Sequence, residues 1–331
     1  MNSPDLSALL QGFFAARLRA QLDASPHTVA AYRDTFRLLL RFASERLKRE
    51  PSQLRVEQLD PFFVGEFLRH LEVCRGNSAR TRNARLAALR AFFRYVAVNE
   101  PAHALQCQRI LAMPSKRYQR APVEFLAEEE VAALVASPNT DTWIGRRDRA
   151  LLAVATQTGL RNSELTSLRR RDVEVGAGAH VQCIGKGRKM RRTPLSSDTA
   201  SILRKWLAER GGGGEDHVFP SARGGRISAD ALQRLVARHA DSASARCPSI
   251  KGKKVTPHAL RHTTAMALLR RGVDLTVIAL WLGHESTETT QIYLHADMRL
   301  KEQALAHGTN NGITPERYRP TDSLLAFLES L

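Results

Sequence analysis

Residues 77–99 read NSARTRNARLAALRAFFRYVAVN, a stretch with the apolar spacing of one long α-helix. The apolar positions that recur every three or four residues are Leu86, Leu89, Phe92, Phe93 and Val96. Asn77-Ser78 is typical of a helix start, because a serine side chain accepts a hydrogen bond from a free N–H of the first turn. The stretch therefore predicts a helix with one buried face.

The opposite face of this predicted helix is basic. No acidic residue occurs between residues 73 and 99. The arginines of the region are Arg75, Arg80, Arg82, Arg85, Arg90 and Arg94. Solvated helix faces usually mix charges of both signs, so this run favours contact with DNA phosphates over a merely solvated face. We predict that all six arginines contact DNA.

The residues before this helix also have helical patterns. The stretch SPHTVAAYRDTFRLLLRFASERL, at residues 25–47, begins with Ser25-Pro26, which suits a helix start with proline in the first turn. LRVEQLDPFFVGEFLRHLEVC, at residues 54–74, predicts one or two shorter helices around Pro61. Residues 1–100 are therefore predicted to form a DNA-binding domain of four or five helices.

The composition of the whole chain agrees with a nucleic-acid partner. Its 331 residues include 50 Lys and Arg against 33 Asp and Glu, which gives a formal net charge of +17. Such an excess favours a polyanion over the alternative of a merely Arg-rich soluble protein. Four scattered cysteines without a CxxC pair argue against a zinc site or a disulfide framework. No apolar run approaches the roughly 20 residues of a membrane span, so we expect a cytoplasmic, nucleoid-associated protein.

A second domain is expected after a linker. Residues 101–123, PAHALQCQRILAMPSKRYQRAPV, contain three prolines and predict a basic linker in which Lys116 and Arg117 contact DNA. Beyond it, helical patterns surround AHVQCIGKGRKMRRTPLS, at residues 179–196, which predicts two short strands around a Gly-Lys-Gly turn. We expect a catalytic domain over 124–310 and a tail over 311–331, with an amphipathic helix in the tail.

Four phrases of the second domain hold polar residues that a helical domain does not need: TGLRNSEL, the hairpin VQCIGKGRKMRRTPL, TPHALRHTTAMALL and WLGHESTETTQIY. The polar residues that they place are Arg161, Lys186, His258, Arg261, His284 and Tyr293. Taken singly, each is more typical of a surface ion pair, a turn or side-chain packing than of catalysis. The pair three residues apart, His258 and Arg261, shares one helical face.

Together and in this order, these six residues resemble the tyrosine recombinase family, also called phage-type integrases. The family pattern runs Arg, Lys, His-x-x-Arg, His, Tyr, and no position is replaced here. The resemblance extends from about residue 8 to 300. It implies a mainly α fold with a small antiparallel sheet. The N-terminal helical bundle would be a SAM-like core-binding domain, and an α+β catalytic domain would follow it.

The resemblance also implies a reaction. Tyr293 would attack a DNA phosphodiester and form a 3′-phosphotyrosyl bond, and a free phenol, with a pKa near 10, needs nearby cations and a proton acceptor for this. Arg161 and Arg261 would hold the non-bridging phosphate oxygens, while Glu164 would orient Arg161 or favour the helix dipole.

The remaining roles concern protons. Lys186 would be the general acid for the 5′-oxygen, His258 would accept the tyrosine proton, and His284 would hydrogen-bond the phosphate.

The partners implied are double-stranded DNA and three further protomers, as a homo-tetramer or a hetero-tetramer with related recombinases. The tail at 322–331 would make the contact between subunits. No metal or nucleotide cofactor is implied. The phrase WLGHESTETTQIYLHAD favours a recombinase of a mobile element over the Xer type. The alternatives are a DNA-binding scaffold without independent catalysis and an enzyme similar to type IB topoisomerases.

Overall fold

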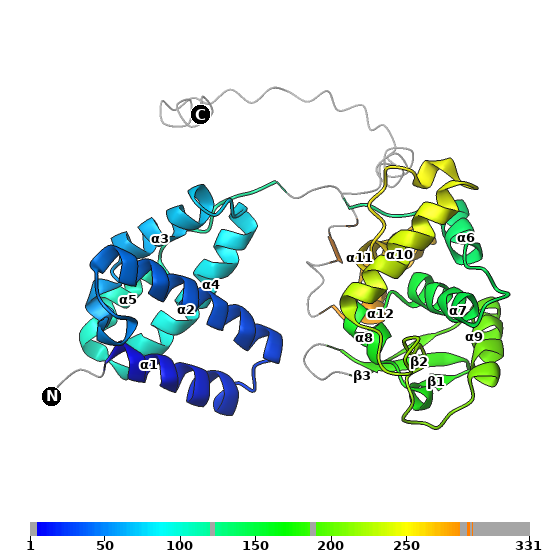
Figure 1. Ribbon diagram of the computed structural model, residues 1–331, viewed down its shortest axis with the longest axis horizontal. Helices are drawn as coiled ribbons and strands as arrows, with labels where there is room; N and C mark the ends of the chain where they lie inside the picture. Colours follow the sequence, from blue (N-terminus) through cyan, green and yellow to red (C-terminus); the bar gives the residue numbers. More distant parts are fainter. Residues whose placement is uncertain (1–4, 120–122, 186–189, 285–289, 292, 294–331) are drawn as a thin grey trace, which may run out of the picture. The chain divides into compact units, whose positions relative to one another are not determined.

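The computed structural model describes residues 5–119, 123–185, 190–284, 290–291 and 293. It divides the chain into two compact units, Met1–Arg120 and Ala121–Leu331, which are traced in Figure 1. Both units are dominated by helices, and the strands belong to the second. The predicted fold class, mainly α with a small antiparallel sheet, is confirmed.

The first unit is a helical bundle. Its helices are α1 (Leu6–Gly12), α2 (Pro26–Leu47), α3 (Pro61–Val73), α4 (Ala79–Asn99) and α5 (Ala104–Leu111), with a π-helical stretch, Phe13–Gln21, after α1. The predicted helix starts are confirmed, because the Ser25 side chain accepts from the N–H of Thr28 and the Ser78 side chain accepts from the N–H of Thr81.

The buried face of α4 forms part of the hydrophobic core of this unit. Leu86, Leu89, Phe92, Phe93 and Val96 are all fully buried, as the apolar spacing predicts. Aromatic side chains from other helices meet this face: the ring centroid of Phe92 lies 5.1 Å from that of Phe36 and 5.5 Å from that of Phe13. Edge-to-face pairs of this kind stabilise a core beyond the area that they bury.

The structure differs from the predicted linker in residues 101–111. A 3₁₀ turn, Pro101–His103, leads into α5, and Cys107 and Ile110 of α5 are fully buried in the core of the first unit. These two residues stand three positions apart and so share one helical face. Prolines at both ends of the segment suggested an irregular tether, yet the short run between them is long enough for a packed helix.

The second unit combines a three-stranded antiparallel sheet with helices. Its elements are α6 (Glu128–Ala136), α7 (Trp143–Thr158), α8 (Asn162–Ser167), β1 (Val173–Glu174), β2 (His180–Ile184), β3 (Met190–Pro194), α9 (Ser197–Arg210), α10 (Ala229–Ser244), α11 (Pro257–Arg270) and α12 (Leu275–Leu282). The strand order is β1-β2-β3, and Cys183 of β2 pairs with Arg191 of β3. The predicted hairpin is confirmed in its strands.

Helix α7 lies against both α9 and α11. Its residues Leu151, Leu152 and Val154 are buried in the main core of the unit, together with Trp206 of α9. The indole nitrogen of Trp206 donates to the carbonyl of Val218 at 2.8 Å, so this buried polar group has a partner. A rigid core therefore supports the ends of α7 and α11.

Two glycines end helices close to one another. Gly159 ends α7 at φ +62° and Gly283 ends α12 at φ +66°, the left-handed conformation that glycine adopts without a steric penalty. A Cβ atom at Gly159 would lie 2.7 Å from Cδ2 of Leu282 and 3.2 Å from Cβ of Thr264, so the close approach of the two helix ends leaves little room for a side chain at residue 159. Within the described ranges, no helix is both long and apolar enough to cross a membrane.

Candidate active site

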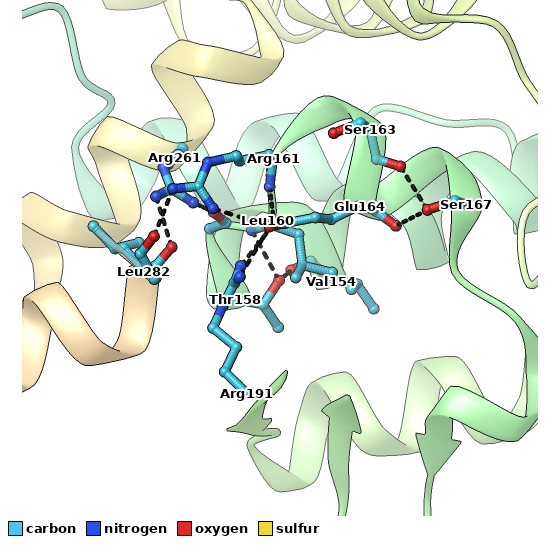
Figure 2. Close-up of polar contacts among 12 residues, drawn as sticks. Val154, Thr158, Leu160, Arg161, Ser163, Glu164, Ser167, Arg191, Arg261 and Leu282 are labelled. Carbon is cyan, nitrogen blue, oxygen red and sulfur yellow. Dashed lines mark hydrogen bonds and ion pairs between the residues drawn. The ribbon is translucent and has the colours of Figure 1, made fainter. Parts of the chain in front are cut away.

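Arg261 is fixed by main-chain carbonyls at these two helix ends. Its side chain rises from the first turns of α11 and is 4% exposed. Nη1 donates to the carbonyl of Gly159 at 2.7 Å, and Nη2 donates to the carbonyl of Leu282 at 2.7 Å. The last carbonyls of a helix have no partner within it, so the guanidinium satisfies them while they fix its plane (Figure 2).

Arg161 reaches the same end of α12 from the opening of α8. Its Nη2 donates to the carbonyl of Gly283 at 2.6 Å, and its Nη1 donates to Oε1 of Glu164 at 3.0 Å. The backbone N–H of Arg161 donates to Oε2 of Glu164 at 2.7 Å. Glu164 thus orients Arg161, as the sequence suggested, and the two arginines are held on adjacent carbonyls.

The Arg261 guanidinium keeps its charge although it is buried. Burial lowers the pKa of Arg261, and the positive charge of Arg161 lowers it further, to about 10. A group with that pKa is still protonated at neutral pH. The site therefore holds two fixed positive charges close together, an arrangement suited to a bound anion.

A third guanidinium belongs to this cluster. Arg191 of β3 donates through Nη1 to Oε1 of Glu164 at 2.9 Å and through Nη2 to Oε2 at 2.7 Å, a two-point contact between side chains that are 10% and 5% exposed. Figure 2 shows the Arg191 side chain extending from the sheet towards this group. Burial alone would raise the pKa of Glu164, but the hydrogen bonds and charge of Arg191, assisted by Arg161, lower it to about 2.

Sequence reasoning did not single out Arg191, which stands among several basic residues of the hairpin. The alternation of side chains along the two strands could have indicated Arg191. Val181 and Cys183 are apolar positions of β2, and their partners across the ladder are Thr193 and Arg191. A basic residue opposite the buried face of a neighbouring strand has to find an internal counter-charge.

Tyr293 is buried beside the arginine cluster. Its side chain is 1% exposed and packs with the apolar residues of α11 and α12, including Met266, Ile278 and Leu282. The loss of solvation raises the pKa of Tyr293 to about 12, although the charge of Arg261 opposes the shift. The phenol is therefore protonated at neutral pH in this structure.

The histidine that meets this phenol is His262. Nδ1 of His262 lies 2.9 Å from the hydroxyl oxygen of Tyr293. His258, for which sequence reasoning predicted the role of proton acceptor, is exposed one turn earlier on α11, with its ring centroid 4.2 Å from that of His262. Burial lowers the pKa of His262, as do the charges of His258 and Arg261, to about 4. A neutral imidazole therefore contacts the phenol at neutral pH.

His284 also lies next to the tyrosine. Its ring is nearly parallel to that of Tyr293, at 14° and 6.4 Å between centroids, and its Nδ1 lies 2.8 Å from Oγ1 of Thr290. Burial lowers the pKa of His284, and the charges of Arg261 and Arg161 lower it further, to about 4. The structure thus brings together Arg161, Arg261, His284 and Tyr293 from distant parts of the chain.

Some predicted residues lie outside the described residues. Lys186 is one of them, and so is the tail at 311–331; the strands on either side of Lys186 end at Ile184 and begin again at Met190. Across the described ranges, no group of three or more His, Cys, Asp and Glu side chains is placed to hold a metal ion.

The arginines predicted to contact DNA divide into two groups. Those that donate a hydrogen bond to a main-chain carbonyl of their own unit are Arg82, Arg85 and Arg90. Those that are exposed are Arg75, Arg80 and Arg94. The first group ties α4 to α2 and to the segment after α5, so these side chains have a structural use that the charge pattern did not reveal.

The two residues after α5 that were predicted to contact DNA are both exposed. Arg117 lies on the surface, and Nζ of Lys116 forms an ion pair with Oε2 of Glu72 at 2.8 Å. Exposed pairs of this kind contribute little to stability, so the Lys116 amine can exchange this partner for another anion.

Comparisons with known proteins agree with this architecture. The model described as "Phage integrase, N-terminal SAM-like domain" matches residues 11–99, and the model "Phage integrase family" matches residues 124–299. A putative integrase/recombinase of Sinorhizobium fredii, y4rC, is 53% identical over 326 residues, 98% of each chain. The tyrosine recombinase XerC of Xylella fastidiosa is 36% identical over 300 residues, which cover 89% of this chain and 94% of the relative.

A solved structure shares the fold. The XerH site-specific recombinase bound to palindromic difH substrate superposes with a TM-score of 0.69 at 24% identity, covering 86% of this chain and 81% of that one. The class of protein is therefore a two-domain tyrosine recombinase, a site-specific DNA recombinase. The chain belongs to the phage integrase family.

Proposed function

We propose that this recombinase cuts and rejoins double-stranded DNA through a 3′-phosphotyrosyl intermediate formed by Tyr293. The observation that carries the proposal is the pair of guanidiniums of Arg161 and Arg261, both fixed on the carbonyl end of α12, beside the buried tyrosine. A phosphodiester carries one negative charge and gains more on its non-bridging oxygens when an oxygen attacks it. Two preorganised cations stabilise that gain.

Each guanidinium keeps donors for the phosphate. An arginine has five N–H groups. Arg161 uses two side-chain donors, towards Gly283 and Glu164, and Arg261 uses two, towards Gly159 and Leu282. The remaining donors suit the non-bridging oxygens, because the carbonyl and carboxylate acceptors hold both guanidinium planes in place. This preorganisation is what makes fixed donors more effective than water.

The nucleophile has to leave its pocket before it reacts. A side chain that is 1% exposed cannot reach a phosphate, and a phenol with a pKa of about 12 is a poor nucleophile. In the step proposed, the Tyr293 oxygen bonds to phosphorus, the bond to the 5′-oxygen breaks, and the phenolic proton passes to a histidine. His262 is the histidine that already contacts the phenol, and His258 stands next to it.

The other roles remain proposals from the family pattern. Lys186 protonates the departing 5′-oxygen, and His284 donates to the phosphate. The reaction conserves the energy of the broken bond in the phosphotyrosine, so a 5′-hydroxyl from another strand can reverse the attack.

We infer that the first unit binds DNA through Arg75, Arg80, Arg94, Lys116 and Arg117. The net charge of +17 over the whole chain favours the association. The XerH structure that shares the fold is bound to its DNA substrate, which supports this partner. Arg82, Arg85 and Arg90 were predicted to contact DNA too; each keeps further N–H groups beyond its main-chain bond.

Exchange of two duplexes would need four protomers, identical or of related recombinases. The relative at 53% identity is described as an integrase/recombinase, and we propose that this chain serves a mobile element.

Covalent capture tests this function. Nicked duplexes tiled across the DNA on both sides of the gene are mixed with the protein without added metal, and denaturing gels detect a protein–DNA adduct. The wild type is expected to form the adduct and Tyr293→Phe is not, while both bind DNA with similar Kd. Adduct formation by the Phe variant would exclude Tyr293 as the nucleophile. Salt-sensitive binding without any adduct would favour a scaffold role, and relaxation of plasmids that lack a specific site would favour a topoisomerase-like enzyme.

A further inference from the structure

We propose that Arg191 is a positioning residue of the active site: it balances the charge of Glu164, so that Arg161 presents its full positive charge to the scissile phosphate. The inference rests on the proposed function, because it assigns Arg161 to the phosphate. It concerns a residue of the hairpin strand β3 that neither the family pattern nor the charge distribution singles out.

The hydrogen bonds of Glu164 are the first argument. Its Oε1 accepts from Nη1 of Arg161 at 3.0 Å and from Nη1 of Arg191 at 2.9 Å. Its Oε2 accepts from the backbone N–H of Arg161 at 2.7 Å and from Nη2 of Arg191 at 2.7 Å. A carboxylate has about four acceptor sites, so the two arginines saturate it. Arg191 supplies half of the donors and both of its terminal nitrogens to this one group.

The charges are the second argument. The cluster contains one carboxylate, of Glu164, which is hydrogen-bonded to the guanidiniums of Arg161 and Arg191. A third guanidinium, of Arg261, interacts with the others through its charge. With Arg191 present, the charge of the carboxylate is balanced from the sheet side, so it does not offset the positive charge that Arg161 presents to the phosphate. Without Arg191, Arg161 would be the one guanidinium hydrogen-bonded to the buried carboxylate, and the negative charge of Glu164 would offset the positive charge of Arg161. A phosphate that gains negative charge during attack would then meet a weaker field.

The packing around Gly283 is the third argument. A Cβ atom at Gly283 would lie 2.9 Å from Nη1 of Arg191, so the guanidinium lies directly against this residue. The carbonyl of Gly283 is the acceptor for Nη2 of Arg161. Arg191 therefore contacts both groups that hold the Arg161 side chain, the carboxylate of Glu164 and the end of α12.

A purely structural ion pair would be a weaker explanation. Buried ion pairs are often no more stabilising than apolar residues of the same volume, because both charges lose their hydration. Nε of Arg191 is also buried without a hydrogen-bond partner among the described residues. Arg191 thus leaves one of its own donors unsatisfied while its terminal nitrogens form the two-point contact with Glu164.

The experiment compares Arg191→Met, Glu164→Gln and the double variant. The probe is the nicked duplex that the wild type captures in the assay above, used at saturating concentration. Arg191→Met is expected to form the adduct about 10²-fold more slowly, a loss comparable to that of one transition-state donor. The double variant is expected to be faster than Arg191→Met, because the carboxylate that needed balancing has been removed. Arg191→Lys keeps the positive charge but cannot form the two-point contact, so its rate of adduct formation should lie between those of the wild type and Arg191→Met.

The matched control is Arg192→Met. Arg192 is the next residue of β3, faces the opposite side of the strand, and bonds only to Oε1 of Gln182 among the contacts that the structure records. The Arg192→Met variant should cleave at nearly the wild-type rate. Tryptophan fluorescence during thermal unfolding reports whether each variant is folded, and slow cleavage by a folded Arg191→Lys keeps the test valid if Arg191→Met unfolds.

A second probe distinguishes protonation of the leaving 5′-oxygen from stabilisation of charge on the phosphate. It is the same duplex with sulfur in place of the bridging 5′-oxygen, since a thiolate leaves without needing a proton. This duplex should restore cleavage by Lys186→Ala and should not restore it in Arg191→Met. Restoration in Arg191→Met would overturn the inference, because Arg191 would then serve the leaving group. So would wild-type rates in Arg191→Met, or a double variant no faster than the single one. A wild type that forms no adduct overturns the proposed function itself.

Discussion

Glu164 allows a quantitative prediction about stability and pH. The pKa of its carboxyl falls from an ordinary 4.5 to about 2 because Arg191 and Arg161 more than offset the effect of burial. At about 1.4 kcal/mol for each tenfold change in the equilibrium, this contributes about 3 kcal/mol to the free energy of unfolding at neutral pH. A depressed native pKa stabilises the fold above the unfolded-state value and loses that effect as the pH falls towards the native value.

The perturbation is Glu164→Gln, compared with wild type from pH 7 to pH 3.5. At pH 7 the variant is expected to be about 3 kcal/mol less stable, because it lacks the ionised carboxylate that Arg191 and Arg161 stabilise. It also leaves the Arg191 guanidinium buried without its counter-charge. Between pH 7 and 3.5 the wild type should lose about 1.4 kcal/mol that the variant does not lose. The gap between the two proteins therefore narrows as the solution becomes more acidic.

Urea unfolding followed by tryptophan fluorescence is the assay. Trp143, Trp206 and Trp281 are the three tryptophans of the chain, and all lie in the second unit, so the signal reports the unit that contains Glu164. Glu129→Gln, which removes an exposed carboxylate from α6, is the reference for general effects of charge. A gap between wild type and Glu164→Gln that stays constant from pH 7 to 3.5 would refute the reasoning, because Glu164 would then act through shape alone.

Three further predictions concern catalysis and binding. Arg161→Ala should lower the rate of adduct formation by about 10²–10³-fold at saturating DNA; near-wild-type rates would contradict its phosphate role. His262→Leu removes the hydrogen-bond partner of the buried phenol, so we expect faster nitration of Tyr293 by tetranitromethane, mapped by peptide mass spectrometry; an unchanged rate would mean that packing alone retains it. Arg94→Ala should reduce the slope of log Kobs against log salt by about 0.9, whereas Arg85→Ala, which breaks hydrogen bonds to α2, should mainly lower stability. The opposite pattern would reverse their assignment.

The helices and their starts could be predicted because their causes are local. The serine caps at 25 and 78 and the apolar stripe of 77–99 each depend on residues a few positions apart. Helix α5 was missed because the prolines at 101 and 114 dominated the pattern, while the burial of Cys107 and Ile110 depends on packing against α4.

The candidate site could be predicted only in part. Arg161, Arg261, His284 and Tyr293 were recognisable through the family pattern, and the structure gathers them. Arg191 and His262 acquire their roles from contacts across 27 and 31 positions of sequence. No local pattern determines which of several neighbouring basic residues or histidines will reach such a partner, since tertiary packing makes the choice.

The acceptors of the two arginines that we propose to bind the phosphate have a consequence for how this enzyme can change. The two guanidiniums donate to four acceptors, and three of these are the main-chain carbonyl oxygens of Gly159, Leu282 and Gly283. Every amino acid has the same carbonyl, so a substitution cannot delete these oxygens; it can only move them by disturbing the helix ends. Selection, or an engineer, can therefore alter other side chains of the site and leave the acceptors that hold Arg161 and Arg261 in place. The vulnerable positions are the two glycines. Both have a positive φ, and a Cβ atom would press on Leu282 at Gly159 and on the Arg191 guanidinium at Gly283.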